Sequence, residues 1–169
     1  LRLPKLLAVR LGTVRMKADG QTLLSISPSG HLPVLDQRAR GTRFMSITVR
    51  SALNSPAATH MGFWSLNPYI GCEFGCTYCY ARDTHRWTLE RMGGSSDYPS
   101  FDRDILVKSN LTDALLRTLD PSKLAGQVLA IGTATDPYQP AERRFRLTRQ
   151  ALETLMRYQG CLLYTSPSP

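Results

Sequence analysis

Three of the four cysteines in this 169-residue chain lie within eight residues, in the stretch GCEFGCTYCYAR. Cys72, Cys76 and Cys79 have the spacing C-x-x-x-C-x-x-C. One disulfide would use only two of these thiols, and a closed structural zinc site needs four ligands. This stretch is therefore expected to form a loop in which three thiols bind one metal-containing group and leave one of its ligand positions open.

Thiolates are soft ligands that favour zinc or iron–sulfur clusters. A zinc site would need a fourth ligand such as His85, six residues after Cys79, and the usual zinc-finger spacings do not fit. A two-iron cluster normally takes four cysteines, whereas a 4Fe-4S cluster held by three leaves one iron free to bind a small molecule. The spacing favours the 4Fe-4S cluster. The alternative is a non-catalytic zinc-binding, nucleic-acid-binding module that uses Cys72, Cys76, Cys79 and His85.

The residues between the cysteines suit a bulky inorganic group. Gly71 and Gly75 let the backbone wrap closely around it. The aromatic side chains of Phe74, Tyr78 and Tyr80 are expected to shield it from water, which would help to set its reduction potential.

The pattern around this loop predicts alternating strands and helices. Apolar and β-branched runs predict strands, and apolar residues at helical spacing predict helices. The order predicts an α/β fold with a parallel sheet. The expected strands are 43–53, 63–71, 101–109 and a buried parallel strand at 128–133, and the expected helices are one or two turns within 81–92, then 110–120 with Asn110 as N-cap, and 141–160.

The net charge of +8 is concentrated at the start of the chain. Residues 1–50 hold nine Lys and Arg against two Asp, so the remainder is close to neutral. This distribution is consistent with an anionic partner such as nucleic acid, and equally with a solvated basic extension. No apolar run is long enough to cross a bilayer and no signal peptide is recognisable, so a reducing cytoplasm is the expected compartment.

The chain resembles the radical SAM superfamily, and within it the proteins similar to spore photoproduct lyase, often described as DNA repair photolyase-like. Three separated motifs carry the resemblance in order: SLNPYIGCEFGCTYCYARDTH (65–85), FDRDILVKSN (101–110) and GTATDPYQPAERRFRLTR (132–149). The resemblance covers about residues 47–160.

The resemblance implies the N-terminal part of a partial (β/α)6 radical SAM barrel. It implies a basic N-terminal extension at 1–46 and the barrel at 47–160, and we interpret 161–169 as a non-native tail. Six βα units of ~30 residues would need about 180 residues. Only about 107 follow from Phe63, so the barrel is expected to be truncated and the chain to be a fragment, inactive as it stands.

The resemblance also implies a radical SAM enzyme, lyase-like, that binds a 4Fe-4S cluster and S-adenosylmethionine (SAM) and cleaves SAM reductively to a 5′-deoxyadenosyl radical. An electron donor such as a flavodoxin or ferredoxin is implied, and a nucleic-acid lesion is the suggested substrate. The metal ligands would be Cys72, Cys76 and Cys79, and the cofactor-binding residues would be Tyr78, Tyr80, Thr133, Thr135 and Asp136.

Four further residues belong to these motifs. Glu142 would either hold SAM or favour a helix N-terminus. Asn67 and Arg82 lie beside the cysteines. For His85, contact with substrate and acid–base catalysis remain open, and a hydrogen bond to the cysteine loop is the favoured expectation.

Overall fold

The strands form two small sheets in the computed structural model, which describes residues 24–25, 32–38, 41–91, 100–158 and 162–164. One sheet has the order β1-β3-β7-β6, with β2 also paired to β3. Its strands are β1 (Leu24–Ser25), β2 (Val34–Gln37), β3 (Arg43–Val49), β6 (Tyr69–Ile70) and β7 (Asp104–Lys108). The second sheet has the order β4 (Leu53–Asn54), β5 (Trp64–Leu66), β8 (Leu129–Ile131) and β9 (Leu162–Tyr164).

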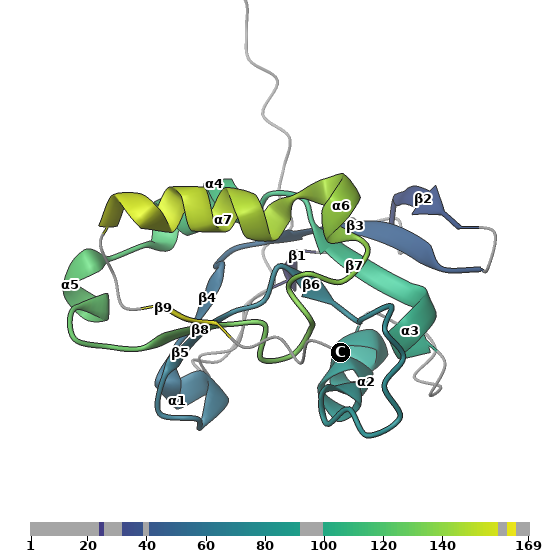
Figure 1. Cartoon of the computed structure of the whole chain (residues 1–169), viewed down its shortest axis with the longest axis horizontal. Helices are drawn as coiled ribbons and strands as arrows, with labels where there is room; N and C mark the ends of the chain where they lie inside the picture. Colours follow the sequence, from purple (N-terminus) through teal and green to yellow (C-terminus); the bar gives the residue numbers. More distant parts are fainter. Residues whose placement is uncertain (1–23, 26–31, 39–40, 92–99, 159–161, 165–169) are drawn as a thin grey trace, which may run out of the picture.

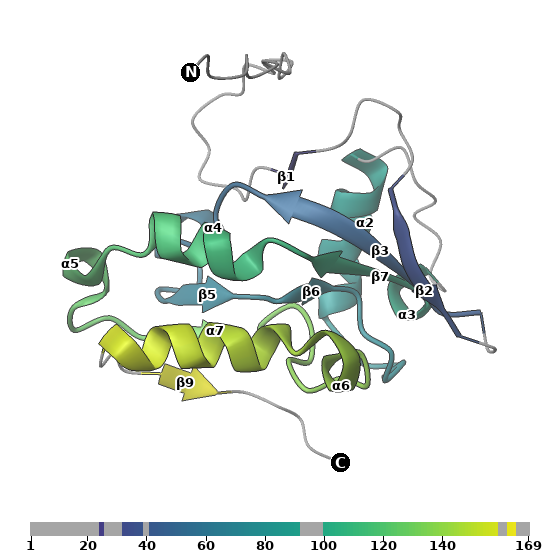
Figure 2. The same cartoon turned by 90° about the horizontal axis from the view of Figure 1, so that it is seen from above.

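Helices cover the sheets on two sides (Figures 1 and 2). The helices α4 (Leu111–Thr118), α6 (Glu142–Phe145) and α7 (Leu147–Leu155) lie on one side, and α1 (Pro56–Thr59) and α2 (Ala81–Arg91) on the other. The remaining elements are α3 (Ser100–Arg103), α5 (Pro121–Leu124) and the 3-10 helix η1 (Met156–Tyr158). None of the helices in these described ranges is long and apolar enough to cross a membrane.

The partial (β/α)6 barrel expected from the resemblance is wrong. The described strands make two separate sheets with mixed pairing: β3–β7, β5–β8 and β8–β9 are parallel, whereas the other pairs are antiparallel. Neither sheet closes on itself within the described part of the chain. The expected parallel sheet is wrong as well, because four of the strand pairs are antiparallel, and the structure is a mixed α/β fold.

The predicted strand 63–71 is divided, and this division separates the sheets. Its first part, β5, pairs in parallel with β8, and its second part, β6, pairs antiparallel with β7. The two parts meet at Asn67-Pro68, where the proline has no N–H to donate to a ladder. The chain therefore leaves one sheet and enters the other over two residues.

Two domain boundaries expected from the sequence can be compared with the positions of strands in the structure. The boundary expected after residue 46 falls inside β3. The segment 161–169, interpreted as a non-native tail, contains β9, which pairs in parallel with β8.

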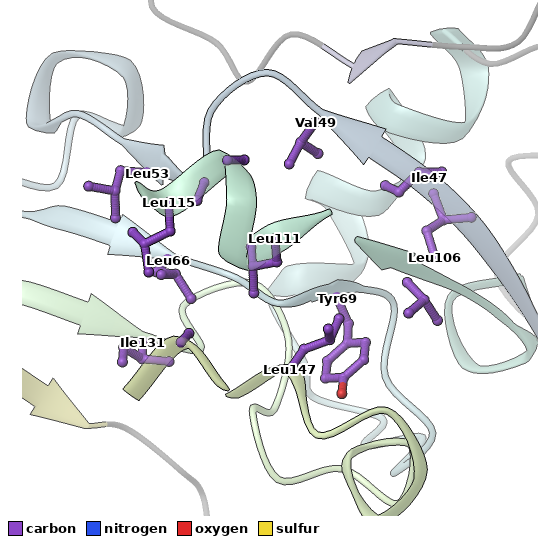
Figure 3. Packing of buried hydrophobic residues seen from close by; sticks show 14 of the residues in the cluster. Ile47, Val49, Leu53, Leu66, Tyr69, Leu106, Leu111, Leu115, Ile131 and Leu147 are labelled. Carbon is purple, nitrogen blue, oxygen red and sulfur yellow. The ribbon is translucent and has the colours of Figure 1, made fainter. Parts of the chain in front are cut away.

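The core lies between the sheets and the helices α4 and α7 (Figure 3). The short apolar run of β8 is fully buried beside β5, which confirms the prediction of a buried parallel strand. The leucine face predicted for α4, which comprised Leu111, Leu115, Leu116 and Leu119, is confirmed at Leu111 and Leu115, which are 0% exposed, but it is wrong at Leu116, which is 49% exposed. Burial of apolar side chains of this size stabilises the fold by about 1.5–3 kcal/mol each.

The single helix predicted over 141–160 is interrupted. Arg146 has a left-handed backbone with φ of 54°, so α6 ends there and α7 begins at the next residue. The carboxylate of Glu142 accepts the backbone N–H groups of Thr148 and Arg149, at 3.1 and 3.0 Å. Because this carboxylate caps α7 from the preceding turn, the chain bends back where helical periodicity alone predicts continuity.

Candidate functional site at the cysteine loop

The cysteine loop, residues 71–80, follows β6 and begins at Gly71, where the packing leaves no room for a side chain. Gly71 has φ of 90°, and a Cβ at this position would lie 2.9 Å from the backbone oxygen of Phe101. The next residue, Cys72, donates its backbone N–H to that same oxygen at 2.9 Å. The loop therefore begins pressed against α3, in a conformation that glycine adopts without strain.

The loop that follows β8 also contacts the start of the cysteine loop, on the side opposite α3. Thr135 donates its hydroxyl to the Gly71 carbonyl oxygen at 2.7 Å. Gln139, 0% exposed, donates its side-chain amide to Gly71 O and to Thr135 Oγ1, and its Oε1 accepts the backbone N–H of Glu73 at 3.0 Å. These contacts join two segments that are more than sixty residues apart in the sequence.

The three thiols of the loop are free, and they differ in exposure. Cys72 is buried, whereas Cys76 and Cys79 are half-buried. Burial raises the pKa of the Cys72 thiol to about 11, although the backbone N–H groups of Phe74 and Asp136 favour its thiolate. A positively charged metal centre would overcome that desolvation, because a coordinated thiol is deprotonated.

Arg82, at the start of α2, fixes the middle of the cysteine loop. Its Nε donates to the carbonyl oxygen of Cys76 at 3.1 Å, and its Nη2 pairs with the carboxylate of Asp102 at 2.9 Å. Its guanidinium also lies over the ring of Phe101, 5.1 Å from the centroid. Arg82 is only 8% exposed, so its planar charged group ties the loop to α3 in a largely buried setting.

The ends of β5 and β8, which are neighbours in one sheet, are joined by hydrogen bonds beside the cysteine loop. Asn67 donates to the hydroxyl of Thr133 at 3.1 Å and accepts the backbone N–H of Ala134 at 2.8 Å. The hydroxyl of Tyr80 donates to the backbone oxygen of Thr133. The expected cofactor-binding residues Tyr80, Thr133 and Thr135 are thus brought together with the start of the cysteine loop.

The aromatic side chains expected to shield a cluster are exposed instead. Tyr78 is 82% exposed, Tyr80 69% and Phe74 45%. Their rings are therefore not covered by packing within the described part of the chain, and they offer apolar faces to a ligand or to another surface.

Asp136 and Glu142 serve local structure. Asp136 is 7% exposed, and its Oδ1 accepts the backbone N–H of Tyr138 at 2.8 Å. Glu142 caps α7 and accepts the hydroxyl of Tyr69. Of the two roles left open for Glu142, the structure shows the helix-terminal one.

His85 does not hydrogen-bond the cysteine loop, so that expectation is wrong. The residue is 2% exposed, and neither ring nitrogen has a hydrogen-bond partner in the described structure. Its ring packs edge-on against Phe101, with centroids 5.2 Å apart. Burial lowers the pKa of His85 to about 4, against the opposing effect of nearby Asp104, so the ring is neutral at pH 7.

Among the described residues, no group of three or more His, Cys, Asp or Glu side chains is arranged to hold a single metal ion. A single zinc ion would need its sulfur ligands about 2.3 Å away.

Sequence reasoning missed Gln139 as a residue of this site. Its side chain makes three of the contacts that hold the cysteine loop, yet a single glutamine in the loop TATDPYQP has no spacing signature. The sequence-level signal is its position within a loop that follows a buried strand, where ligand-binding and loop-positioning groups gather.

Comparison with known proteins finds uncharacterized relatives. An uncharacterized protein of Mycobacterium tuberculosis is 38% identical over 109 residues, which are 63% of this chain and 31% of that protein. An uncharacterized protein of Methanocaldococcus jannaschii is 31% identical over 90 residues, covering 53% of this chain and 30% of the relative. One from Acidianus two-tailed virus is 30% identical over 91 residues, covering 53% and 29%.

The chain spans about a third of the length of these curated relatives. No protein-family model matches the chain. No solved structure matches it significantly.

Proposed function

We propose that this chain belongs to a radical SAM enzyme, in which Cys72, Cys76 and Cys79 bind a 4Fe-4S cluster and the open iron binds S-adenosylmethionine. The observation that carries the proposal is a C-x-x-x-C-x-x-C loop with three free thiols, held by hydrogen bonds against the loop after β8. The resemblance of three ordered motifs to the spore photoproduct lyase-like branch supports it.

The residues fit such a cluster by the chemistry of their donors. Three sulfur ligands on one short loop, with no disulfide between them, suit iron–sulfur ligation. Gly71 permits the close turn at the start of the loop, and Arg82 holds its middle through the Cys76 carbonyl oxygen. When bound, the cluster and SAM supply a 5′-deoxyadenosyl radical by one-electron reductive cleavage of the sulfonium.

The protein's own part is to position the cofactors. Thr135 and Gln139 fix the backbone of Gly71 and Glu73, and so set where the first thiol lies. The segment containing Thr133, Thr135 and Asp136 is proposed to bind SAM at the end of β8. The exposed rings of Tyr78 and Tyr80 are proposed to flank its adenine.

The wider setting follows from the same proposal. Reduction of the cluster calls for an electron donor such as a flavodoxin or ferredoxin in the cytoplasm, and free thiols suit that reducing compartment. A nucleic-acid substrate is proposed from the basic balance of residues 1–50.

Anaerobic reconstitution with iron and sulfide tests the proposal. We expect about four iron and four sulfide per chain, and a reduced EPR signal that changes when SAM is added. Cys76→Ala should lose most of the iron. Cys161→Ala, which removes the one cysteine outside the loop, is the matched control and should keep it.

Stoichiometric zinc without iron uptake would overturn the cluster assignment and favour the zinc-binding module. Equal iron content in the Cys76→Ala and Cys161→Ala chains would show that the loop thiols are not the ligands. An EPR signal that does not respond to SAM would remove the SAM part while leaving the cluster.

A further inference from the structure

Two neighbouring residues of α3 reach two different cysteines of the loop. The backbone oxygen of Phe101 accepts the N–H of Cys72 at 2.9 Å. The next residue, Asp102, pairs through its carboxylate with Arg82, which donates to the carbonyl oxygen of Cys76 at 3.1 Å. The short helix α3 therefore sets the position of Cys76 relative to Cys72, and Arg82 is the link to the second cysteine.

The charge of Arg82 is held largely out of water. The residue is 8% exposed, and its guanidinium lies over the ring of Phe101, 5.1 Å from the centroid. Its Nη2 lies 2.9 Å from Oδ1 of Asp102 and donates to Oδ2 at 3.0 Å. Interactions between charges are stronger where water is excluded, so this cation acts on nearby charges more than an exposed arginine would.

The acid of this pair also lies against the cysteine loop. A Cβ at Gly75, the residue before Cys76, would lie 3.6 Å from Oδ2 of Asp102. Without a partner, this carboxylate would place a negative charge beside thiols that become negative thiolates when they bind a metal. Because Arg82 pairs with the carboxylate, the loop lies beside a neutral pair instead of an unpaired acid.

We propose that Arg82 is a positioning residue for the cluster: it fixes Cys76, offsets the charge of Asp102, and so keeps the reduction potential less negative than it would be beside an unpaired acid. This inference rests on the cluster proposed above for the three loop thiols. Net charge and hydrogen bonding around a cluster set its reduction potential. Reduction adds an electron, so an unpaired negative charge nearby makes reduction less favourable.

Redox titration of the reconstituted 169-residue chain, followed by the EPR signal of the reduced cluster, tests the charge effect. Arg82→Gln removes the cation and leaves the acid, so the midpoint potential should become more negative by about 59 mV, a tenfold change in the one-electron equilibrium. Asp102→Asn removes the acid and leaves the cation, so the potential should become less negative. In the chain that carries both substitutions, the potential should lie between those of the two single variants.

Arg117→Gln is the matched control for the loss of one positive charge. Arg117 is an exposed arginine of α4, which lies on the opposite side of the sheets from α2 (Figure 1). Its replacement changes the net charge by the same amount as Arg82→Gln, at a site where water screens the charge. The potential of the cluster should therefore stay unchanged in this variant.

Iron release to a chelator tests the positioning of Cys76 separately from the charge. Arg82→Lys keeps a positive charge but lacks the planar group that reaches Asp102 and the Cys76 carbonyl together. This variant should release iron about tenfold faster than Arg117→Lys, and its potential should shift less than that of Arg82→Gln. Equal release rates in the two lysine variants would overturn the positioning role.

Failure of this inference can be told apart from failure of the cluster assignment. An unsubstituted chain that takes up no cluster would overturn both. Clusters in all variants would overturn this inference alone if Arg82→Gln and Asp102→Asn shift the potential in the same direction, or no further than Arg117→Gln. If Arg82→Gln holds no cluster, Asp102→Asn decides, because it keeps the arginine and must still make the potential less negative.

Discussion

Gln139 donates its side-chain amide to the backbone carbonyl oxygen of Gly71, 3.2 Å away and 68 positions earlier in the chain. This bond joins the loop after β8 to the first residue of the cysteine loop. The other end of the same amide accepts the N–H of Glu73, so one buried side chain holds both residues that flank Cys72.

Replacing Gln139 by alanine should destabilise the fold by about 2–4 kcal/mol, because it leaves the Glu73 N–H and the Gly71 carbonyl without their side-chain partner in a buried setting. Urea unfolding followed by circular dichroism measures the loss. Gln127→Ala is the matched control, since Gln127 is exposed, and its effect should stay below about 0.5 kcal/mol. Equal losses in the two variants would contradict the role of Gln139.

Glu142→Gln should lower stability by about 1–2 kcal/mol. The substitution keeps the shape of the side chain but removes the charge that accepts two backbone N–H groups at the start of α7 and the hydroxyl of Tyr69. Thermal unfolding checks the prediction. Glu153→Gln breaks only an exposed pair with Arg149, so it should change stability by less than about 0.5 kcal/mol. Identical melting temperatures for the two variants would argue against the cap.

Stability should fall as the pH drops from about 6.5 towards about 4, in part because of His85. Burial lowers its pKa from 6.5 to about 4, so between these values the unfolded chain binds a proton that the folded chain does not. The contribution of His85 is complete above pH 6.5 and amounts to up to about 3 kcal/mol, lost by pH 4.

Urea unfolding at several pH values compares His85→Leu with the unsubstituted chain. The variant should show a flatter pH dependence across this window, because the proton-linked difference is gone. His60→Asn, at an exposed histidine with φ of 56°, should leave the slope unchanged. A slope that His85→Leu does not reduce would show that the ring is protonated in the folded state.

In the metal-free, reduced chain, Cys72 should react with iodoacetamide at least about tenfold more slowly than Cys76 or Cys79 at pH 8. Its thiol is buried and has a raised pKa of about 11, so little of the reactive thiolate is present. Mass spectrometry of the labelled peptides measures the three rates. In urea the rates should become similar, and equal rates in the folded chain would show that Cys72 is accessible.

The spacing of apolar residues along the sequence predicted those helices and strands that are defined by their own residues. Leu111 and Leu115 of α4 and the apolar run of β8 are buried, as helical spacing and a short continuous run predict, whereas Leu116 is exposed. Asn110 precedes α4 as expected, but its side chain makes no cap. It instead exchanges hydrogen bonds with the backbone N–H and carbonyl of Val49, at 2.8 and 2.9 Å. This partner lies 61 residues away, so no local pattern could show it.

Two of the failures share that cause. The strand predicted at 63–71 is correct in being extended, yet its division between two sheets depends on which distant strands pair with each half. The contacts of Gln139 depend on a loop more than sixty residues away. The break at Arg146 is different, because it depends on a nearby carboxylate, that of Glu142, which caps the next helix. Pairing between distant segments is set by tertiary packing, which overrides the local preference of the chain.

The passage of one extended segment from β5 to β6 has a consequence for how the molecule opens. Only Asn67 and Pro68 separate the strands that enter the two sheets, and Asn67 is itself bonded across to Thr133 and Ala134. If the strands of one sheet separate, the other sheet should therefore be disturbed too, because the two-residue link between β5 and β6 is too short to let one strand move alone. Amide hydrogens of β7 and β8 should then exchange with solvent through one shared opening event, with similar free energies and similar sensitivity to denaturant.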